Sequence, residues 1–523
     1  MKKILIFLSV GIVLAGVCAF VFVKTDIWSV KNLQSISNKQ PNIIFILTDD
    51  QALSDLEYMP KVQKYLVQEG KTFTNYFDNY AVCCVARASI LRGQNANNTG
   101  IKGNAEPAGG YEIFHAKGVD GEDQTAGVWL QNSGYHTVFM GKYLNGYGTG
   151  DTTFVPPGWT DWFGFSDNTQ GLYDYQVNHN GELIEYGSDP EDFKTDVLSK
   201  EVVAFLKQQN ETTKPYFIYL APTAPHSPAT AAPRHEDMFK DVQVPRSASY
   251  NEVDVSDKPQ FIRELPLLDD KDIKQTDNAY RKRLQSLQAV DDMVENIVTT
   301  LESTRQLDTT YIFFTSDNGF HLGQHRMPSG KRTAYEEDIH LPLVVRGPGV
   351  TPGTIDDIVG NIDFVPTWSE IVGGLSISYE PDGRSFAGLL SSSFLQPATW
   401  RNGYLIGFEL DDLVANGGIE SPAWLDKINN KKKERMDSDE QNLAGDDVLK
   451  IGFAGVRTKN YVYVEYGNGD KEFYDLLKDP YQLQNTYPIA NPALLLAHQQ
   501  MLAAMRKCEG TSCKIAEQMP IGN

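Results

Sequence analysis

Residues 42–51, with the sequence NIIFILTDDQ, begin with an apolar run and end with two neighbouring carboxylates, Asp49 and Asp50. A short, continuous apolar run rich in β-branched residues is typical of a strand buried on both faces. Burying two carboxylates at the end of such a strand costs free energy unless a cation lies close to them. One of them could instead cap a following helix. The stretch predicts a central strand of an α/β sheet with a charged site at its carboxyl end.

The same pattern recurs three more times along the chain. The apolar runs, each with the polar residues that follow it, are 136–140 with Lys142, 216–220 with His226, and 310–314 with Asp317 and Asn318. Sites in open α/β sheets form outside the carboxyl ends of the strands, so parallel neighbours would bring these residues to one cleft. Between the last two runs, residues 280–301 carry apolar side chains at helical spacing, which predicts an amphipathic crossover helix.

We therefore predict an α/β fold with a large mixed, mainly parallel sheet flanked by helices, over residues 41–399. From about residue 400 the pattern changes to a smaller C-terminal antiparallel-sheet subdomain, residues 400–523. It contains a hairpin around a Gly-Asn-Gly-Asp turn at residues 467–470 and a last helix over about 492–507. Residues 426–447 are densely charged and predict a solvated insertion loop.

The N-terminus carries a targeting segment. Two lysines are followed by an almost wholly apolar stretch, residues 4–23, which predicts a signal peptide or N-terminal membrane anchor over residues 1–24 and a polar linker over 25–40. The body of the protein is then exported: periplasmic, secreted, or anchored to the membrane by residues 4–23, its only membrane contact. In an oxidising compartment we expect Cys508 and Cys513 to form a disulfide; the alternative is two free thiols.

The amino-acid composition limits which classes of protein this chain can belong to. The 523 residues are 41% hydrophobic, as in a globular protein with a large core, and carry 47 basic against 68 acidic residues, a formal charge of −21. Nucleic-acid binders carry a basic surface, so we expect no nucleic-acid partner. A small anionic ligand would need several cations gathered in one cleft.

A second stretch, NYAVCCVARASILRG at residues 79–93, places two cysteines just before a run, 86–91, that predicts the first turns of a helix. A helix start offers unpaired N–H groups and the positive end of the helix dipole, which would lower the pKa of the Cys83 thiol and favour an anion. Arg87 adds a planar donor fork suited to an oxyanion. The alternative is that Cys83 and Cys84 are simply two small buried hydrophobic residues.

The polar residues at the strand ends form two chemical sets. Asp49, Asp50, Asp317 and Asn318 are hard oxygen donors, which suit one Ca²⁺ or Mg²⁺ per chain. The cationic side chains are Arg87, Lys142, His226 and Lys331. A dication among these groups describes a pocket for a tetrahedral anionic ester.

Several motifs occur together in the order found in the sulfatase family, of the alkaline-phosphatase-like superfamily. They are LTDDQ at 47–51, the pattern C-x-x-x-RASIL-x-G from Cys83, GKYLN at 141–145, PPGW at 156–159, APHSP at 224–228, SDNG at 316–319, LGQH at 322–325 and GK at 330–331. The sequences YDL at 474–476 and KDP at 478–480 resemble the C-terminal signature of the family. Within the family, the chain is most similar to N-acetylglucosamine-6-sulfatases and related glycan sulfatases.

The resemblance implies a sulfuric ester hydrolase acting on a sulfated carbohydrate, 6-sulfated N-acetylglucosamine or a related glycan. A formylglycine-generating maturation enzyme would convert Cys83, whose hydrated aldehyde attacks sulfur and also faces the metal. In this scheme Lys142, His226 and Lys331 hold the sulfate and Arg87 orients the hydrate. Many relatives have histidine where this chain has Leu144. His226 and His325 are therefore the candidates for the base that takes a proton in the last step, when sulfate is eliminated.

Two other functions stay open at this stage. A phosphoester or phosphonate hydrolase of the same superfamily would use a similar pocket, because sulfate and phosphate monoesters share a shape. The family usually has proline, often followed by serine, where this chain has Val85 and Ala86. That departure prompts the alternative of a catalytically inactive glycan-binding protein. The mass of the Cys83 peptide distinguishes an enzyme from such a binding protein.

Overall fold

The computed structural model describes residues 40–105, 109–116, 121–166, 171–209, 214–408 and 452–521. The predicted leader, the linker up to residue 39 and the insertion loop 426–447 lie outside these residues. Among the helices that are described, none is long and apolar enough to cross a membrane.

The four apolar runs form four adjacent parallel strands, as predicted. They are β1 (Asn42–Thr48), β4 (His136–Gly141), β8 (Tyr216–Ala221) and β9 (Thr310–Ser316), in the spatial order β9-β1-β8-β4. Six further strands extend the sheet to ten: β2 (Lys71–Phe73), β5 (Asp161–Phe165), β6 (Tyr175–His179), β7 (Glu182–Tyr186), β10 (Leu343–Arg346) and β11 (Gly353–Ile355). The antiparallel pairs involve β10, β6 and β7, on either side of the parallel centre. The predicted mixed, mainly parallel sheet is confirmed.

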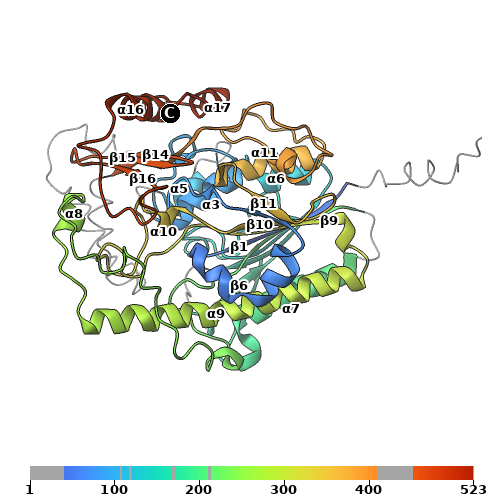
Figure 1. Cartoon of the computed structure of the whole chain (residues 1–523). Helices are drawn as coiled ribbons and strands as arrows, with labels where there is room; N and C mark the ends of the chain where they lie inside the picture. Colours follow the sequence, from blue (N-terminus) through green and yellow to red (C-terminus); the bar gives the residue numbers. More distant parts are fainter. Residues whose placement is uncertain are drawn as a thin grey trace, which may run out of the picture. The chain divides into compact units, whose positions relative to one another are not determined.

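Helices cover both faces of this sheet (Figure 1). Alternate residues of a strand point to opposite faces, and in β1 Phe45 joins a core with α3 (Cys83–Arg92), α6 (Ala126–Asn132) and α11 (Phe364–Ile371). Its neighbours Ile44 and Ile46 pack with α7 (Lys194–Gln209) and α9 (Asp270–Ser303) on the other face. Burial on both faces explains the lack of polar alternation in the four runs.

The α9 helix begins ten residues before the range predicted from its apolar stripe. Asp269 caps it by accepting the N–H groups of Lys271 and Asp272, and the first turns are largely exposed. Exposed helical turns carry no apolar stripe, so periodicity alone finds only the buried part of the helix.

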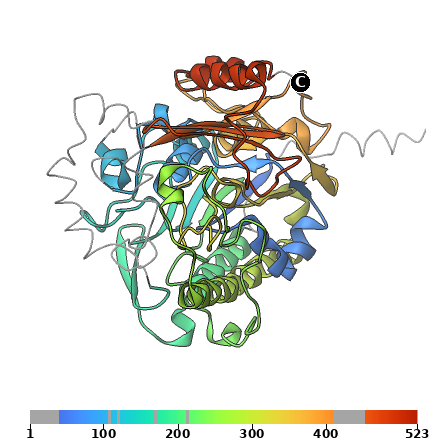
Figure 2. The same cartoon turned by 60° about the vertical axis from the view of Figure 1, so that its left-hand side comes forward.

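The C-terminal hairpin is confirmed and belongs to a four-stranded antiparallel sheet (Figure 2). Its strands are β13 (Gly403–Phe408), β14 (Phe453–Thr458), β15 (Tyr461–Tyr466) and β16 (Lys471–Asp475). One face packs on the predicted last helix, α16 (Pro492–Met505), through Met501 and Leu502. The other face joins the core of the large sheet through Tyr404 and Phe453. The described residues from Pro41 onward therefore form one compact unit, and the boundary at residue 400 stays a prediction.

The remaining elements are short. They are η1 (Leu53–Tyr58), α2 (Pro60–Val62), η2 (Gln63–Val67), β3 (Tyr76–Phe77), α4 (Ala96–Thr99), α5 (Gly110–Ala116), η4 (Pro190–Asp192), η5 (Pro233–His235), α8 (Gln260–Arg263), η6 (Leu307–Thr309), α10 (Glu336–Ile339), β12 (Val359–Gly360), η7 (Asn361–Asp363), α12 (Ala387–Leu390) and α17 (Thr511–Ala516).

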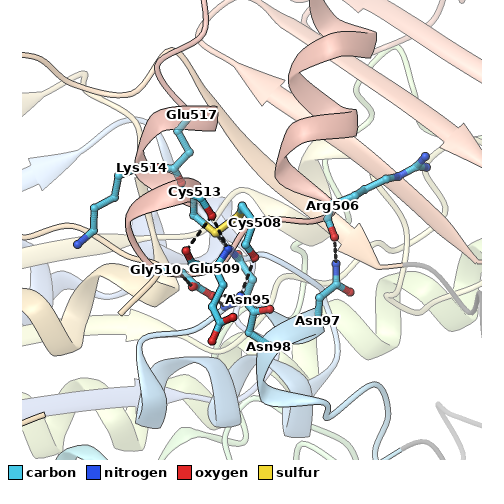
Figure 3. The surroundings of a disulfide bond; sticks show 12 residues. Asn95, Asn97, Asn98, Arg506, Cys508, Glu509, Gly510, Cys513, Lys514 and Glu517 are labelled. Atoms are coloured by element: carbon cyan, nitrogen blue, oxygen red, sulfur yellow. Dashed lines mark hydrogen bonds between the residues drawn. A yellow bond between two sulfur atoms is a disulfide. The ribbon is translucent and has the colours of Figure 1, made fainter. Parts of the chain in front are cut away.

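The two C-terminal cysteines, Cys508 and Cys513, form the predicted disulfide. Figure 3 shows that the loop they close lies against α4, where the side-chain amide of Asn98 donates to the carbonyl of Cys508 at 3.0 Å. The N–H of Gly510, inside the loop, donates to Asp382 at 2.7 Å. Because α4 follows α3 closely in the chain, this loop helps to fix the C-terminal end of α3, the helix that carries Cys83.

Candidate active site

The carboxyl ends of β1, β8 and β9 are joined by hydrogen bonds. The N–H of Asp49 donates to the carbonyl of Ala224 at 3.2 Å, and the N–H of Asp317 donates to the carbonyl of Thr48 at 3.1 Å. The N–H of Asp50 donates to Asp317 Oδ1 at 3.0 Å. The polar residues after these three strands therefore lie in one place, as the sequence predicted.

Cys83 faces this convergence from the first turn of α3. The helix begins at Cys83, with Val82 extended before it, and not near Ala86 as predicted. The sulfur of Cys83 lies 3.4 Å from Asp49 Oδ1 and 3.7 Å from Asp50 Oδ1. The side chain is fully buried.

The predicted lowering of the Cys83 thiol pKa is wrong. Burial raises this pKa well above its ordinary value, and the carboxylates of Asp49 and Asp317 act in the same direction. Lys142 and Lys331 oppose the change without reversing it. A helix N-terminus is a partial charge, and here it competes with full carboxylate charges in a buried site.

Each predicted cation reaches one of the carboxylates. Arg87 Nε donates to Asp317 Oδ2 at 2.8 Å, and its Nη1 donates to the carbonyl of Lys142 at 2.6 Å. Lys142 Nζ lies 2.5 Å from Asp49 Oδ2. Lys331 Nζ lies 2.5 Å from Asp50 Oδ1 and 2.7 Å from the sulfur of Cys83. Three carboxylates and three permanent cations thus surround Cys83 with balanced formal charge.

His226 belongs to the same cluster. Its Nδ1 donates to the carbonyl of Ser227 at 3.0 Å, which leaves Nε2 facing Asp50 Oδ2 at 3.7 Å. Burial disfavours the protonated imidazole, but the carboxylates of Asp50 and Asp49 outweigh burial and raise the His226 pKa. The side chains of His226 and Lys142 each keep 11% exposure, whereas the other clustered side chains are nearly or fully buried.

His325 lies in a different environment. Its Nδ1 is 2.6 Å from Glu252 Oε2 and its ring stacks on Tyr335 with centroids 4.2 Å apart. Burial lowers its pKa to about 4. Within the described part of the chain, no contact joins His325 to Asp49, Asp50 or Cys83. Of the two candidate bases, only His226 lies beside Cys83.

The site contains a cluster of side chains that could hold a metal ion. Ligating atoms of Asp49, Asp50, Cys83 and His226 all lie within 4.8 Å of one another. Asn318 donates through Nδ2 to Asp50 Oδ1 at 2.6 Å, and its buried Oδ1 has no hydrogen-bond partner among the described residues. An unpaired buried amide oxygen beside carboxylates is the type of atom that Ca²⁺ or Mg²⁺ binds.

Asp317 is less open to a metal than the sequence suggested. Its Oδ1 accepts the N–H groups of Asp50 and Asn318, and its Oδ2 accepts from Arg87. Burial raises its pKa to about 6, and the neighbouring charge of Asp49 adds to that change. A divalent cation would relieve this repulsion between carboxylates.

Two buried residues of the site were not found from the sequence. Arg283 on α9 donates to the carbonyl of Asp50. Asp338 in α10 accepts the N–H and hydroxyl of Thr333, two residues after Lys331, and pairs with His321 at 2.9 Å. The available signal for Arg283 was its place within the apolar stripe of α9, because a charge on a buried face needs a partner.

Comparison with known proteins gives the family. The model of the Sulfatase family matches residues 41–374, more than half of the chain. The N-acetylglucosamine-6-sulfatase of Homo sapiens is 33% identical over 490 residues, which cover 91% of this chain and 86% of that protein. The chain belongs to the sulfatase family, and it is a sulfuric ester hydrolase.

Solved structures share the fold. A protein in complex with its substrate D-glucosamine-2-N,6-O-disulfate has a TM-score of 0.69 and 23% identity, covering 92% of this chain and 99% of that one. A phosphonate monoester hydrolase of Agrobacterium radiobacter has a TM-score of 0.61 and 20% identity, covering 89% of this chain and 95% of that one. Since one fold serves both kinds of ester, the fold alone does not choose between them.

Proposed function

We propose that this sulfatase removes sulfate from a sulfated amino sugar, 6-sulfated N-acetylglucosamine or a related glycan. The proposal is supported by the similarity to N-acetylglucosamine-6-sulfatase over most of the chain. The observation that carries the catalytic part is the position of the Cys83 sulfur, within 3.7 Å of two carboxylate oxygens and 2.7 Å from Lys331 Nζ. The apolar segment at residues 4–23 supports action outside the cytoplasm.

Each clustered residue has a proposed role. A maturation enzyme converts Cys83 to formylglycine, whose hydrate supplies the hydroxyl nucleophile. Asp49, Asp50, Asp317 and Asn318 would hold one Ca²⁺ (or Mg²⁺) beside residue 83, and this ion would supply Lewis-acid polarisation of the sulfate oxygens. Arg87 orients the hydrate.

The remaining cationic side chains bind the sulfate group. Lys142, His226 and Lys331 donate to the sulfate oxygens, and the partial exposure of Lys142 and His226 marks the side from which the ester enters. His226 is also the proposed base that takes the proton in the final elimination, because it is the candidate histidine that lies beside Cys83. Since its Nδ1 donates to the carbonyl of Ser227, it can take this proton only at Nε2, in a step in which Nε2 no longer donates to sulfate.

The runner-up activity is hydrolysis of a phosphoester or phosphonate. A sulfate monoester carries one negative charge and a phosphate monoester approaches two near neutral pH, so a site whose donors are mostly singly charged groups favours sulfate modestly. On paired sulfate and phosphate esters of one aryl alcohol, we expect kcat/KM to favour the sulfate by about tenfold, or roughly 1.4 kcal/mol in the transition state. A higher kcat/KM for the phosphate ester would replace the proposed activity with the runner-up.

The charge of the chain bears on the size of the substrate. A protein with a formal charge of −21 repels a long polyanion, whereas a terminal sugar needs only the local cations of the site. We expect higher specific activity on 6-sulfated N-acetylglucosamine and short sulfated oligosaccharides than on intact polymer. This difference in specific activity should become smaller as the salt concentration rises. Faster release of sulfate from interior positions of the polymer at low salt would contradict this.

A further inference from the structure

Arg283 is a buried cation whose hydrogen bonds go to carbonyl groups. It is 3% exposed and lies on α9. Its Nη2 donates to the carbonyl of Asp50, its Nη1 lies 3.4 Å from the carbonyl of Pro225, and its guanidinium sits 4.1 Å from the ring centroid of Phe320. These three partners come from the segments that follow β1, β8 and β9. One side chain from a helix therefore touches all three catalytic segments.

The first of these contacts fixes an unusual backbone. Asp50 has φ of 68°, in the left-handed region that residues other than glycine rarely adopt. Its N–H is held by Asp317 Oδ1 at 3.0 Å and its carbonyl by Arg283, so both sides of the residue are fixed. In this conformation the carboxylate of Asp50 reaches Lys331 Nζ at 2.5 Å and the sulfur of Cys83 at 3.7 Å.

The second contact bears on His226. Pro225 precedes His226 and forms a parallel bridge with Asp49. By binding the carbonyls of Asp50 and Pro225 together, Arg283 sets the spacing between the two segments. The facing atoms, His226 Nε2 and Asp50 Oδ2, are 3.7 Å apart.

The choice of partners argues against a role in packing alone. A guanidinium buried for stability is expected to sit against a carboxylate, because an unpaired buried charge is costly. Among the described carboxylates, none lies within salt-bridge distance of Arg283. Its guanidinium donates instead to the backbone carbonyl of Asp50, a proposed metal ligand. Its charge also acts, from beyond salt-bridge distance, on the buried carboxylates of Asp55 and Asp50.

We propose that Arg283 is a positioning residue for the active site: it holds Asp50 in the left-handed conformation that aims its carboxylate at Cys83, and it fixes the distance from Asp50 to His226. This inference rests on the proposed roles of Asp50 and His226. It predicts that loss of the guanidinium weakens metal binding without touching any ligand. Groups that act through a metal ligand typically change metal affinity by about 10- to 100-fold.

The test uses Arg283→Met and Arg283→Lys, with Arg281→Met as the matched control. Arg281 is on the same helix, but its contacts are the carbonyl of Val242 and the side chain of Asn278, away from the site. Calorimetric titration with Ca²⁺, without substrate, should show about 10- to 100-fold weaker binding for Arg283→Met. Arg283→Lys should show a smaller loss, because one ammonium keeps the charge and cannot span both carbonyls. Arg281→Met should bind as the unmodified sequence does.

Hydrogen exchange on the metal-free protein gives a second readout that a packing role would not produce. We expect faster exchange at the amides of Asp50 and His226 in both Arg283 variants, with β1, β8 and α9 still protected. Unchanged Ca²⁺ affinity and unchanged exchange in Arg283→Lys would overturn the inference, even if Arg283→Met fails to fold. If the unmodified sequence binds neither Ca²⁺ nor Mg²⁺, the proposed metal site fails, and local exchange alone then decides the role of Arg283.

Discussion

Replacing Cys83 with alanine is expected to abolish hydrolysis of sulfate esters while leaving the fold and divalent-cation binding largely intact. The side chain is the proposed precursor of the nucleophile, and its sulfur sits among Asp49, Asp50 and Lys331. Losing a covalent nucleophile typically lowers kcat by on the order of 10⁴-fold or more. The measurement is turnover of an aryl sulfate, with circular dichroism and Ca²⁺ titration of the same preparation.

Cys84 supplies the matched control. It neighbours Cys83 in the chain, is equally buried, and lies in the core cluster beneath α3. Cys84→Ala should cost some stability through a small cavity and keep most of the activity. An inactive Cys84→Ala together with an active Cys83→Ala would show that the nucleophile has been assigned to the wrong cysteine.

The mass of the peptide that contains residue 83 separates an enzyme from an inactive glycan-binding protein. Conversion of the thiol to an aldehyde makes this peptide about 18 Da lighter. We expect the lighter form in protein produced with a formylglycine-generating enzyme, despite Val85 and Ala86 at positions where the family usually has other residues. An unmodified cysteine in all of that protein would favour the binding-protein alternative.

The strand ends could be predicted from sequence because the signal is local and repeated. Each apolar run is followed within six residues by its polar residue, and the rule that parallel strands place their carboxyl ends together supplies the rest. The ring of Lys142, His226, Asp317 and Asp50 around Cys83 follows from that rule. The spacing of residues along the chain was enough to predict which residues meet.

The finer properties of the site depend on distances that no local pattern contains. The pKa of Cys83 is raised mainly by burial and further by the carboxylates of Asp49 and Asp317, which lie far from it in sequence. The choice between His226 and His325 depends on which loop turns toward Cys83. The left-handed backbone of Asp50 needs Arg283, and a charge in the apolar stripe of α9 does not reveal which carbonyl it will meet.

Asp49→Asn is expected to lower Ca²⁺ affinity by roughly 100-fold or more and to reduce turnover in parallel. The substitution keeps the shape of the side chain and removes one of the few full negative charges that a buried dication can meet, where electrostatic attraction is strong. It also leaves Lys142 Nζ, now 2.5 Å from Asp49 Oδ2, with a neutral partner. That second effect places excess positive charge in the site and further opposes the cation.

Asp237→Asn is the control for this substitution, because Asp237 is an almost fully exposed carboxylate that pairs only with Lys240 among the described salt bridges. In the unmodified sequence and in Asp237→Asn, Ca²⁺ at about 100 times its Kd should add roughly 2.7 kcal/mol to the free energy of unfolding. In Asp49→Asn the same Ca²⁺ concentration should add less than about 0.5 kcal/mol, because binding that is 100-fold weaker leaves the site half filled. Full activity after exhaustive chelation, or one tightly bound zinc per chain, would refute a hard-cation site, since zinc prefers nitrogen and sulfur ligands.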